Sequence, residues 1–318
     1  MGPPRDARPQ GEDCLNLTIA APARGTGARP VLVWFHGGGF SSGAGLMDWY
    51  DGGVLAAEGD VVVVGINHRL GALGYLCLDG VSEGNLGLCD QLEALRWVHG
   101  HIAEYGGDPG DVTVIGQSAG GISVRLLMEL PAARGLFRRA VLQSTPLGFT
   151  ARPREESLAM GRTFADALGD DPRTAGVPEI LAAQRETALA TLRRTGRPME
   201  PAFVPAEDTG LVPSPGAFFD ENVRGLDVLY GWNADDMTAF WRTRPPSAAG
   251  SPQGVRSATG GDLRPRWRVS VCSCFAPGAR AGRWSSGKRQ SSCGGSSRGR
   301  AGTPNEPRSR SCCARSPG

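Results

Sequence analysis

The pentapeptide Gly116-Gln117-Ser118-Ala119-Gly120 constrains this chain more than any other feature. It follows the β-branched run 112–115 and precedes 122–130, where apolar residues recur at the spacing of one helix face. A strand, then G-x-S-x-G, then a helix is typical of a nucleophile elbow, whose glycines leave room for a sharp turn that presents a serine. The pattern therefore predicts that Ser118 is a nucleophile. The alternative is an ordinary glycine-rich turn between a strand and a helix.

A second glycine-rich loop follows the apolar run 30–35, which is typical of a strand covered on both faces. The loop reads His36-Gly37-Gly38-Gly39-Phe40. Successive glycines leave backbone N–H groups uncovered, and an oxyanion hole needs such donors where negative charge develops. A flexible loop is the alternative for the glycines alone. The strand before them and the elbow downstream favour the oxyanion hole.

The rest of the body alternates predicted strands and helices, as α/β folds do. Apolar residues at 88, 92, 95, 98 and 102 fall on one helix face, and 157–168 and 180–192 are also predicted to be helical. Further predicted strands are 12–19, 61–66, 139–144 and 226–231.

Taken together, these segments resemble the type-B carboxylesterases, a group that includes bacterial para-nitrobenzyl esterases and, more distantly, cholinesterases. The resemblance rests on 12–15, 36–40, 84–91 and 105–120, and it covers roughly residues 11 to 145 in the family's order. It implies an α/β-hydrolase fold with a mostly parallel central sheet and flanking helices. It also implies hydrolysis of small carboxylic esters without a metal or an organic cofactor.

The resemblance assigns roles to individual residues. Ser118 is the expected nucleophile, and the N–H groups of Gly38 and Gly39 are expected oxyanion donors. Ala119 follows as a third donor because it comes directly after the nucleophile. Asp236 stands at the position of the family's acid, with Asp in place of the usual Glu. A solvated acidic loop is the alternative at Asp236.

The expected base is missing. In this fold the histidine follows the acid in the chain, but all four histidines precede Ser118. His99 and His101 are predicted at the opposite edge of the sheet. His36 and His68 follow strands directly, so they share an edge with Ser118, and we interpret them as structural rather than as surrogate bases. The sequence therefore predicts impaired or absent activity. The alternative is a non-catalytic hydrolase-fold remnant or interaction protein.

The net charge of +2 hides a sharp compositional break. Residues 241–318 hold 15 Lys and Arg against 2 Asp and Glu, so their charge is +13, while residues 1–240 carry −11. We expect a disordered start at 1–10, a partial hydrolase domain at 11–240 and a disordered Arg-, Ser-, Gly- and Cys-rich tail at 241–318. We interpret the tail as a frameshift product, which leaves the fold incomplete at its C-terminal end.

Two other interpretations of the tail are weaker. A basic segment can bind nucleic acid or an anionic membrane, but no binding fold is recognisable. Cys272-x-Cys274 lacks the usual C-x-x-C spacing and a nearby histidine, which disfavours a metal site. We expect no nucleic-acid, membrane or metal partner.

Neither a stretch of membrane-spanning length nor the apolar core of a signal peptide is present. We therefore expect a soluble, cytoplasmic chain with reduced cysteines. The sequence leaves the oligomeric state and the preferred acyl and alcohol groups open.

Overall fold

The structure is a computed structural model that describes residues 10–23, 27–148, 151–197, 200–212, 223–233, 236 and 267–272. All of these belong to one compact unit, Met1–Cys274. A second unit, Phe275–Gly318, lies outside the described residues.

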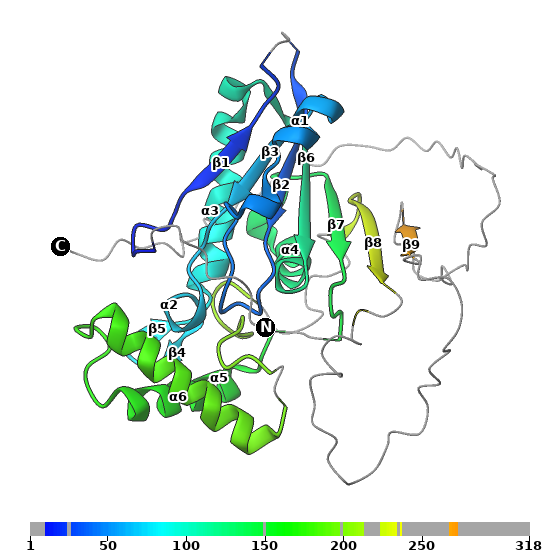
Figure 1. Cartoon of the computed structure of the whole chain (residues 1–318). Helices are drawn as coiled ribbons and strands as arrows, with labels where there is room; N and C mark the ends of the chain where they lie inside the picture. Colours follow the sequence, from blue (N-terminus) through cyan, green and yellow to red (C-terminus); the bar gives the residue numbers. More distant parts are fainter. Residues whose placement is uncertain are drawn as a thin grey trace, which may run out of the picture. The chain divides into compact units, whose positions relative to one another are not determined.

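The main sheet has seven strands in the order β1-β3-β2-β6-β7-β8-β9 (Figure 1). The five strands from β3 to β8 in that order run parallel, whereas β1 and β9 run antiparallel to their neighbours. The strands are β1 (Leu17–Ala20), β2 (Arg29–Phe35), β3 (Val62–Ile66), β6 (Gly107–Gln117), β7 (Arg139–Gln143), β8 (Asp227–Asn233) and β9 (Trp267–Cys272).

The central strands are continuous apolar runs because helices cover both faces of a parallel sheet. Every residue of β3 is buried. Val33 of β2 lies between Val64 of β3 and Val114 of β6, and the side chains of all three are fully buried. This register aligns the carboxyl ends of β2, β6 and β7, where the two glycine-rich loops begin.

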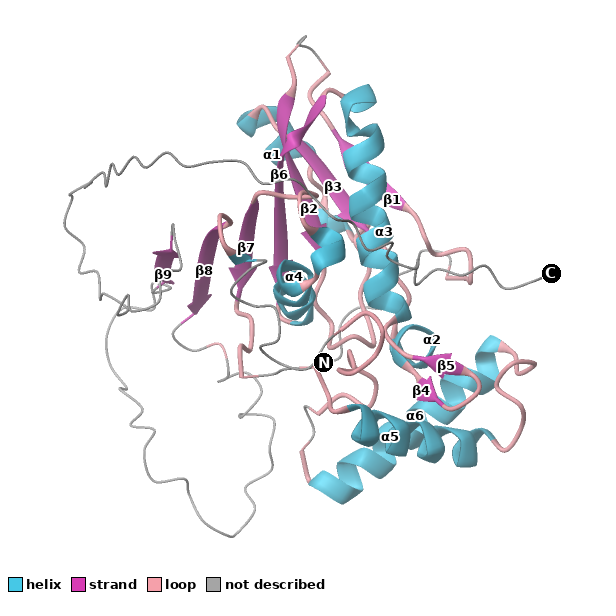
Figure 2. Cartoon of the chain, turned by 180° about the vertical axis from the view of Figure 1, so that it is seen from behind, coloured by secondary structure: helices cyan, strands magenta, loops and turns pink. Residues whose placement is uncertain are grey.

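Helices flank the sheet, and a smaller group of elements lies apart from it. Figures 1 and 2 both show α5 and α6 side by side with the β4–β5 hairpin, away from the seven strands. The helices are α1 (Gly53–Gly59), α2 (Gly71–Tyr75), α3 (Leu86–His101), α4 (Ala119–Glu129), α5 (Arg154–Leu168) and α6 (Val177–Thr195), with short 3-10 turns at Asp48–Tyr50, Ile102–Tyr105 and Pro131–Ala133. The hairpin strands are β4 (Cys77–Leu78) and β5 (Ser82–Glu83).

The predicted elements of the body are confirmed, with shifted ends. β6 begins five residues before the predicted 112–115 run, because Gly107 already pairs with Arg29. β1 is shorter than the predicted 12–19, because its pairing with β3 starts only at Leu17. The fold class, a mostly parallel sheet with flanking helices, is confirmed.

One strand of the sheet lies in the tail and was not among the predicted elements. Trp267–Cys272 forms β9, antiparallel to β8. Residues 267–271 alternate apolar and polar types, which is a strand pattern that the tail's overall composition obscures. The other residues of 241–318, and 1–9, lie outside the described residues, so disorder there stays a prediction.

Among the described residues, no helix is both long and apolar enough to cross a membrane. Two cysteines of the body, Cys14 and Cys77, are free thiols.

Candidate active site

Ser118 lies in a strained turn between β6 and α4. Its φ of 53° and ψ of −117° fall outside the regions that residues with a Cβ normally adopt. β6 ends at Gln117 and α4 begins at Ala119, so this one residue carries the change of direction. A strained, non-glycine residue at a strand-to-helix turn is the geometry of a nucleophile elbow.

Glycines on either side of Ser118 let backbone segments meet without side chains between them. A Cβ on Gly116 would overlap the backbone of Gly120. A Cβ on Gly120 would in turn overlap the backbone carbonyl of Phe35 at the end of β2. The start of α4 is therefore pressed against β2 and β6, and this fixes the position of Ser118.

Backbone hydrogen bonds tie the elbow to the neighbouring strands. The N–H of Ser118 donates to the carbonyl of Gln143 over 3.0 Å, and the N–H of Ser144 donates to the carbonyl of Gly231 over 2.7 Å. Within the part of the chain that the structure describes, the Ser118 hydroxyl makes no hydrogen bond. The elbow is held by its backbone, and its hydroxyl is left for other partners.

The loop 36–39 lies against the elbow because β2 and β6 are neighbours in the sheet. Gly37 faces Gln117 so closely that a Cβ would overlap its side chain. Gly38 and Gly39 have φ values of 121° and 63°, conformations that favour glycine. The glycines therefore serve both the close approach and the turn.

Hydrogen bonds to carbonyl oxygens fix two peptide units of this loop. Nδ1 of His36 lies 2.8 Å from the carbonyl oxygen of Gly37. The carbonyl of Gly38 accepts hydrogen bonds from the N–H and the hydroxyl of Ser42, both over 3.1 Å. Because C=O and N–H point in opposite directions in a trans peptide, the N–H groups of Gly38 and Gly39 point away from these partners. Neither N–H donates to another described residue.

Ala119 supplies a third N–H next to Ser118. It is the first residue of α4 and is buried. The first N–H groups of a helix have no partner within the helix and lie at the positive end of its dipole. The structure thus places Ser118, Ala119 and the Gly38–Gly39 loop at the carboxyl ends of the neighbouring strands β2 and β6.

Asp236 lies in a turn after β8, at the same edge of the sheet as Ser118. Its Oδ2 accepts a hydrogen bond from the N–H of Asn233 over 3.1 Å. Burial raises the pKa of the Tyr230 hydroxyl, and the negative charge of Asp236 raises it further. The structure gives no contact between Asp236 and Ser118, and no described histidine contacts Asp236.

No described histidine is placed as a base for Ser118. His99 and His101 are exposed in the last turn of α3. That helix leads through the Ile102–Tyr105 turn to the start of β6, which is the opposite edge of the sheet from the elbow. This confirms the predicted placement of these two residues. His36 and His68 make no hydrogen bond to Ser118.

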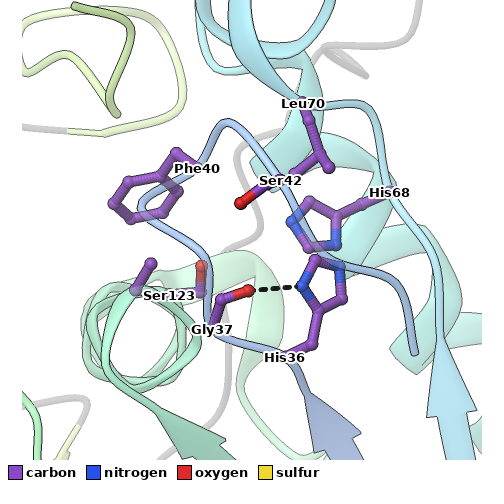
Figure 3. Close-up of a pocket in the computed structure, with 8 residues that line it drawn as sticks. His36, Gly37, Phe40, Ser42, His68, Leu70 and Ser123 are labelled. Atoms are coloured by element: carbon purple, nitrogen blue, oxygen red, sulfur yellow. Dashed lines mark hydrogen bonds between the residues drawn. The ribbon is translucent and has the colours of Figure 1, made fainter. Parts of the chain in front are cut away.

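His36 and His68 instead contact each other. Their rings are stacked with centroids 4.6 Å apart and an interplanar angle of 23° (Figure 3). Burial lowers the pKa of both imidazoles; it lowers that of His68 to about 3, with His36 as a second cause. Both rings are therefore neutral at pH 7. The small cavity that they line with Ser123 admits no water-sized molecule.

The described residues contain no group of three or more His, Cys, Asp or Glu side chains that could hold a metal ion. Cys274, Cys293, Cys312 and Cys313 lie outside the described residues.

Comparison with known proteins identifies the family. The model of the carboxylesterase family matches residues 2–259, most of the chain. The chain belongs to the carboxylesterase family. The match extends beyond the 11–240 segment that the sequence assigns to the hydrolase domain, in both directions.

Bacterial hydrolases are among the relatives of this carboxylesterase-family chain. It is 42% identical to a probable N-octanoylanthranilate hydrolase of Rhodococcus erythropolis, over 78% of this chain and 56% of the relative. It is 37% identical to the para-nitrobenzyl esterase of Bacillus subtilis (strain 168), over 73% of this chain and 49% of the relative. The chain thus spans about half the length of these relatives.

Solved structures agree with this assignment. A PNB esterase structure superposes with a TM-score of 0.70 at 35% identity, over 78% of this chain and 54% of that one. A thermophilic PNB esterase gives a TM-score of 0.68 at 35% identity, over 76% of this chain and 51% of that one. The fold described above is therefore the α/β-hydrolase fold of carboxylesterases.

The stacking of His36 on His68 is the feature of the site that sequence reasoning missed. The sequence held only part of the signal: His36 directly follows β2 and His68 comes two residues after β3, but that these strands are neighbours is known only from the structure.

Proposed function

We propose that this chain carries the nucleophile, the oxyanion donors and the acid of a serine carboxylesterase that acts on small carboxylic esters. We also propose that its turnover is slow, because no histidine follows Asp236 in the sequence. The observation that carries the proposal is the strained Ser118 backbone, supported on both sides by glycine contacts that admit no side chain.

In the proposed reaction, Ser118 Oγ attacks the ester carbonyl carbon and loses its proton to solvent water. The carbonyl oxygen gains negative charge and accepts hydrogen bonds from the N–H groups of Gly38, Gly39 and Ala119. The C–O bond to the alcohol then breaks, and the departing alkoxide takes up a proton. Water hydrolyses the resulting acyl-serine and releases the carboxylic acid.

This scheme lacks a protein group that accepts the proton of Ser118. A serine hydroxyl is a poor nucleophile until a neighbouring base accepts its proton. The described residues place no such base at Ser118, and Asp236 has no histidine to orient. Attack is then limited to the small fraction of Ser118 hydroxyls that lose their proton to solvent, while the N–H donors still stabilise the oxyanion that forms. We therefore expect weak but measurable hydrolysis.

A non-catalytic role is the second candidate, and the same missing base favours it. The fold can serve as an interaction module without a working triad. The two candidates differ in what Ser118 does, because a non-catalytic protein needs the fold but not the serine hydroxyl.

Hydrolysis of p-nitrophenyl butyrate by the purified chain, by Ser118→Ala and by Ser82→Ala tests the proposal. Ser82 is the matched control, because its hydroxyl accepts from the N–H of Gly84 in the β4–β5 hairpin. We expect slow hydrolysis that falls to background in Ser118→Ala and persists in Ser82→Ala. Equal rates in all three proteins would favour the non-catalytic role, and rates typical of complete esterases would overturn slow turnover.

A further inference from the structure

Two imidazole rings form a buried stack just after the carboxyl ends of strands β2 and β3. The exposed fractions of His36 and His68 are 3% and 6%. Figure 3 shows the His68 ring next to the His36 ring and the Gly37 carbonyl oxygen hydrogen-bonded at the edge of the His36 ring. Gly43 adjoins the same ring, and a Cβ there would come within 2.9 Å of His36 Cε1. The His36 ring is thus held by contacts from separate parts of the chain.

The hydrogen bond to Gly37 determines where the His36 proton lies. A backbone carbonyl only accepts hydrogen bonds, so Nδ1 of His36 must carry the proton over this 2.8 Å contact. A neutral ring then leaves Nε2 without a proton, and Nε2 is buried without a partner among the described residues. His68 Nδ1 is buried without a partner in the same way.

Among the described residues, no charged group in the surroundings stabilises a protonated ring. The cavity is lined by the two histidines and by uncharged residues from the oxyanion loop, the segment after β3 and α4: Gly37, Phe40, Ser42, Leu70, Ala119 and Ser123. Arg69, the charged neighbour of His68 in the chain, is paired with Asp90. Lowered pKa values for both imidazoles agree with this environment.

We propose that His68 is a positioning residue of the oxyanion hole that acts through His36. The His68 ring keeps the His36 ring in the orientation in which its Nδ1–H donates a hydrogen bond to the Gly37 carbonyl. The Gly37–Gly38 peptide is thereby fixed with its N–H directed away from His36. The orientation follows from the contacts described, and only the use of the Gly38 N–H as an oxyanion donor rests on the proposed function.

Nitrogen-15 NMR of the histidines tests this directly, because the chain has only four. Long-range proton–nitrogen spectra distinguish an Nδ1–H from an Nε2–H imidazole. We expect His36 to be a neutral Nδ1–H tautomer at pH 7. His68→Phe keeps a flat ring and should preserve this tautomer and the amide shifts of Gly38 and Gly39, whereas His68→Leu, which keeps bulk without a ring, should alter both.

His101→Ala is the matched control for these spectra. His101 also stacks on a ring, that of Trp97 at 4.9 Å, and its Nδ1 lies 3.0 Å from the Trp97 carbonyl. Its removal should leave the Gly38 and Gly39 signals unchanged. An Nε2–H tautomer of His36 in the wild type, or the same spectra for His68→Phe and His68→Leu, would overturn the proposal. If His68→Leu does not fold, His68→Gln takes its place as the variant without a ring, with the same expected result.

Binding of phenylboronic acid links the positioning role to the oxyanion hole. The probe forms a tetrahedral boronate with Ser118 Oγ, whose proton passes to the buffer, and the negative adduct needs the N–H donors. We expect about tenfold weaker binding by His68→Leu than by His68→Phe, and none by Ser118→Ala. Wild-type protein with the expected NMR spectra but no boronate binding would contradict the proposed function and leave the positioning of the peptide intact. Equal affinities of the two His68 variants would overturn the role of His68 in the oxyanion hole.

Discussion

The backbone carbonyl of Phe35 lies where a side chain on Gly120 would have to go. This contact joins the end of β2, which leads into the Gly37–Gly39 loop, to the first turn of the helix after Ser118. The position of Ser118 and the position of this glycine loop are therefore set by the same close approach.

Replacing Gly120 with alanine should destabilise the fold. The added Cβ would overlap backbone atoms, which cannot move aside as a flexible side chain can, and we expect the free energy of unfolding to fall by about 3 kcal/mol. Urea denaturation measures this change. Gly100→Ala in α3 is the control, because nothing lies within 4 Å of its Cβ position, and it should stabilise by about 0.5–1 kcal/mol. Similar effects of the two changes would contradict the close approach.

The buried histidine pair should make stability depend on pH. The folded-state pKa of His68 is lowered to about 3 from 6.5, and that of His36 is also lowered. Between pH 6.5 and pH 3 the unfolded chain therefore binds more protons than the folded chain. The contribution of the neutral His68 to the free energy of unfolding is complete above pH 6.5 and is lost as the pH falls toward 3. For His68 alone, the free energy of unfolding should fall by about 1.4 kcal/mol for each unit by which the pH is lowered within this window.

Denaturation curves from pH 7 to pH 4 for the wild type and His68→Phe measure this slope. The variant should show a shallower dependence, because it has one buried titrating group fewer. His99→Ala is the control and should keep the wild-type slope, since His99 is exposed. A wild-type slope in His68→Phe would show that His68 is not responsible.

Arg152 should stabilise the packing of the segment after α6 against the rest of the domain. Its buried guanidinium donates to the carbonyls of Pro201 and Ala202 over 2.7 and 2.6 Å. Its backbone also exchanges hydrogen bonds with Pro205 and Glu207. Arg152→Met leaves the two carbonyls without their donor, and we expect a loss of about 1–3 kcal/mol.

Hydrogen exchange locates the effect of Arg152→Met. Faster exchange should be confined to the described residues 200–212 and to the start of α5. Arg173→Met is the control, because Arg173 donates to the carbonyl of Gly80 from an exposed side chain, and its removal should change stability by less than about 0.5 kcal/mol. Equal losses for the two variants would contradict a special role of Arg152.

Asp236→Asn should leave the residual activity nearly unchanged. The carboxylate bonds to the N–H of Asn233 and contacts neither Ser118 nor a described histidine. An acid without a histidine to orient has no route to the nucleophile. We expect hydrolysis of p-nitrophenyl butyrate within about twofold of the wild-type rate. A tenfold loss in a folded variant would show that Asp236 is coupled to Ser118.

Much of this fold was predictable because local patterns and tertiary packing agree. The apolar run of β3 and the G-x-S-x-G turn are local signals, and both occur in the structure as predicted. The site could be located from the sequence because Gly116 and Gly120 are each needed where two backbone segments lie in contact.

The remainder depends on contacts between distant residues. No local pattern shows that Arg152 binds the carbonyls of residues 201 and 202, or that His68 stacks on His36. β9 was missed because the composition of the tail outweighed a five-residue alternation at 267–271. Pairing across a sheet follows from topology, which short sequence windows do not contain.

Imidazole rescue tests the central claim, that Ser118 is presented with its oxyanion donors and lacks only a base. Release of p-nitrophenol from p-nitrophenyl butyrate is measured at increasing imidazole concentration for the wild type and Ser118→Ala, and the variant supplies the rate of imidazole in solution. The account predicts a wild-type rate that rises above the variant in proportion to imidazole. Identical rates for the two proteins at every concentration would contradict it.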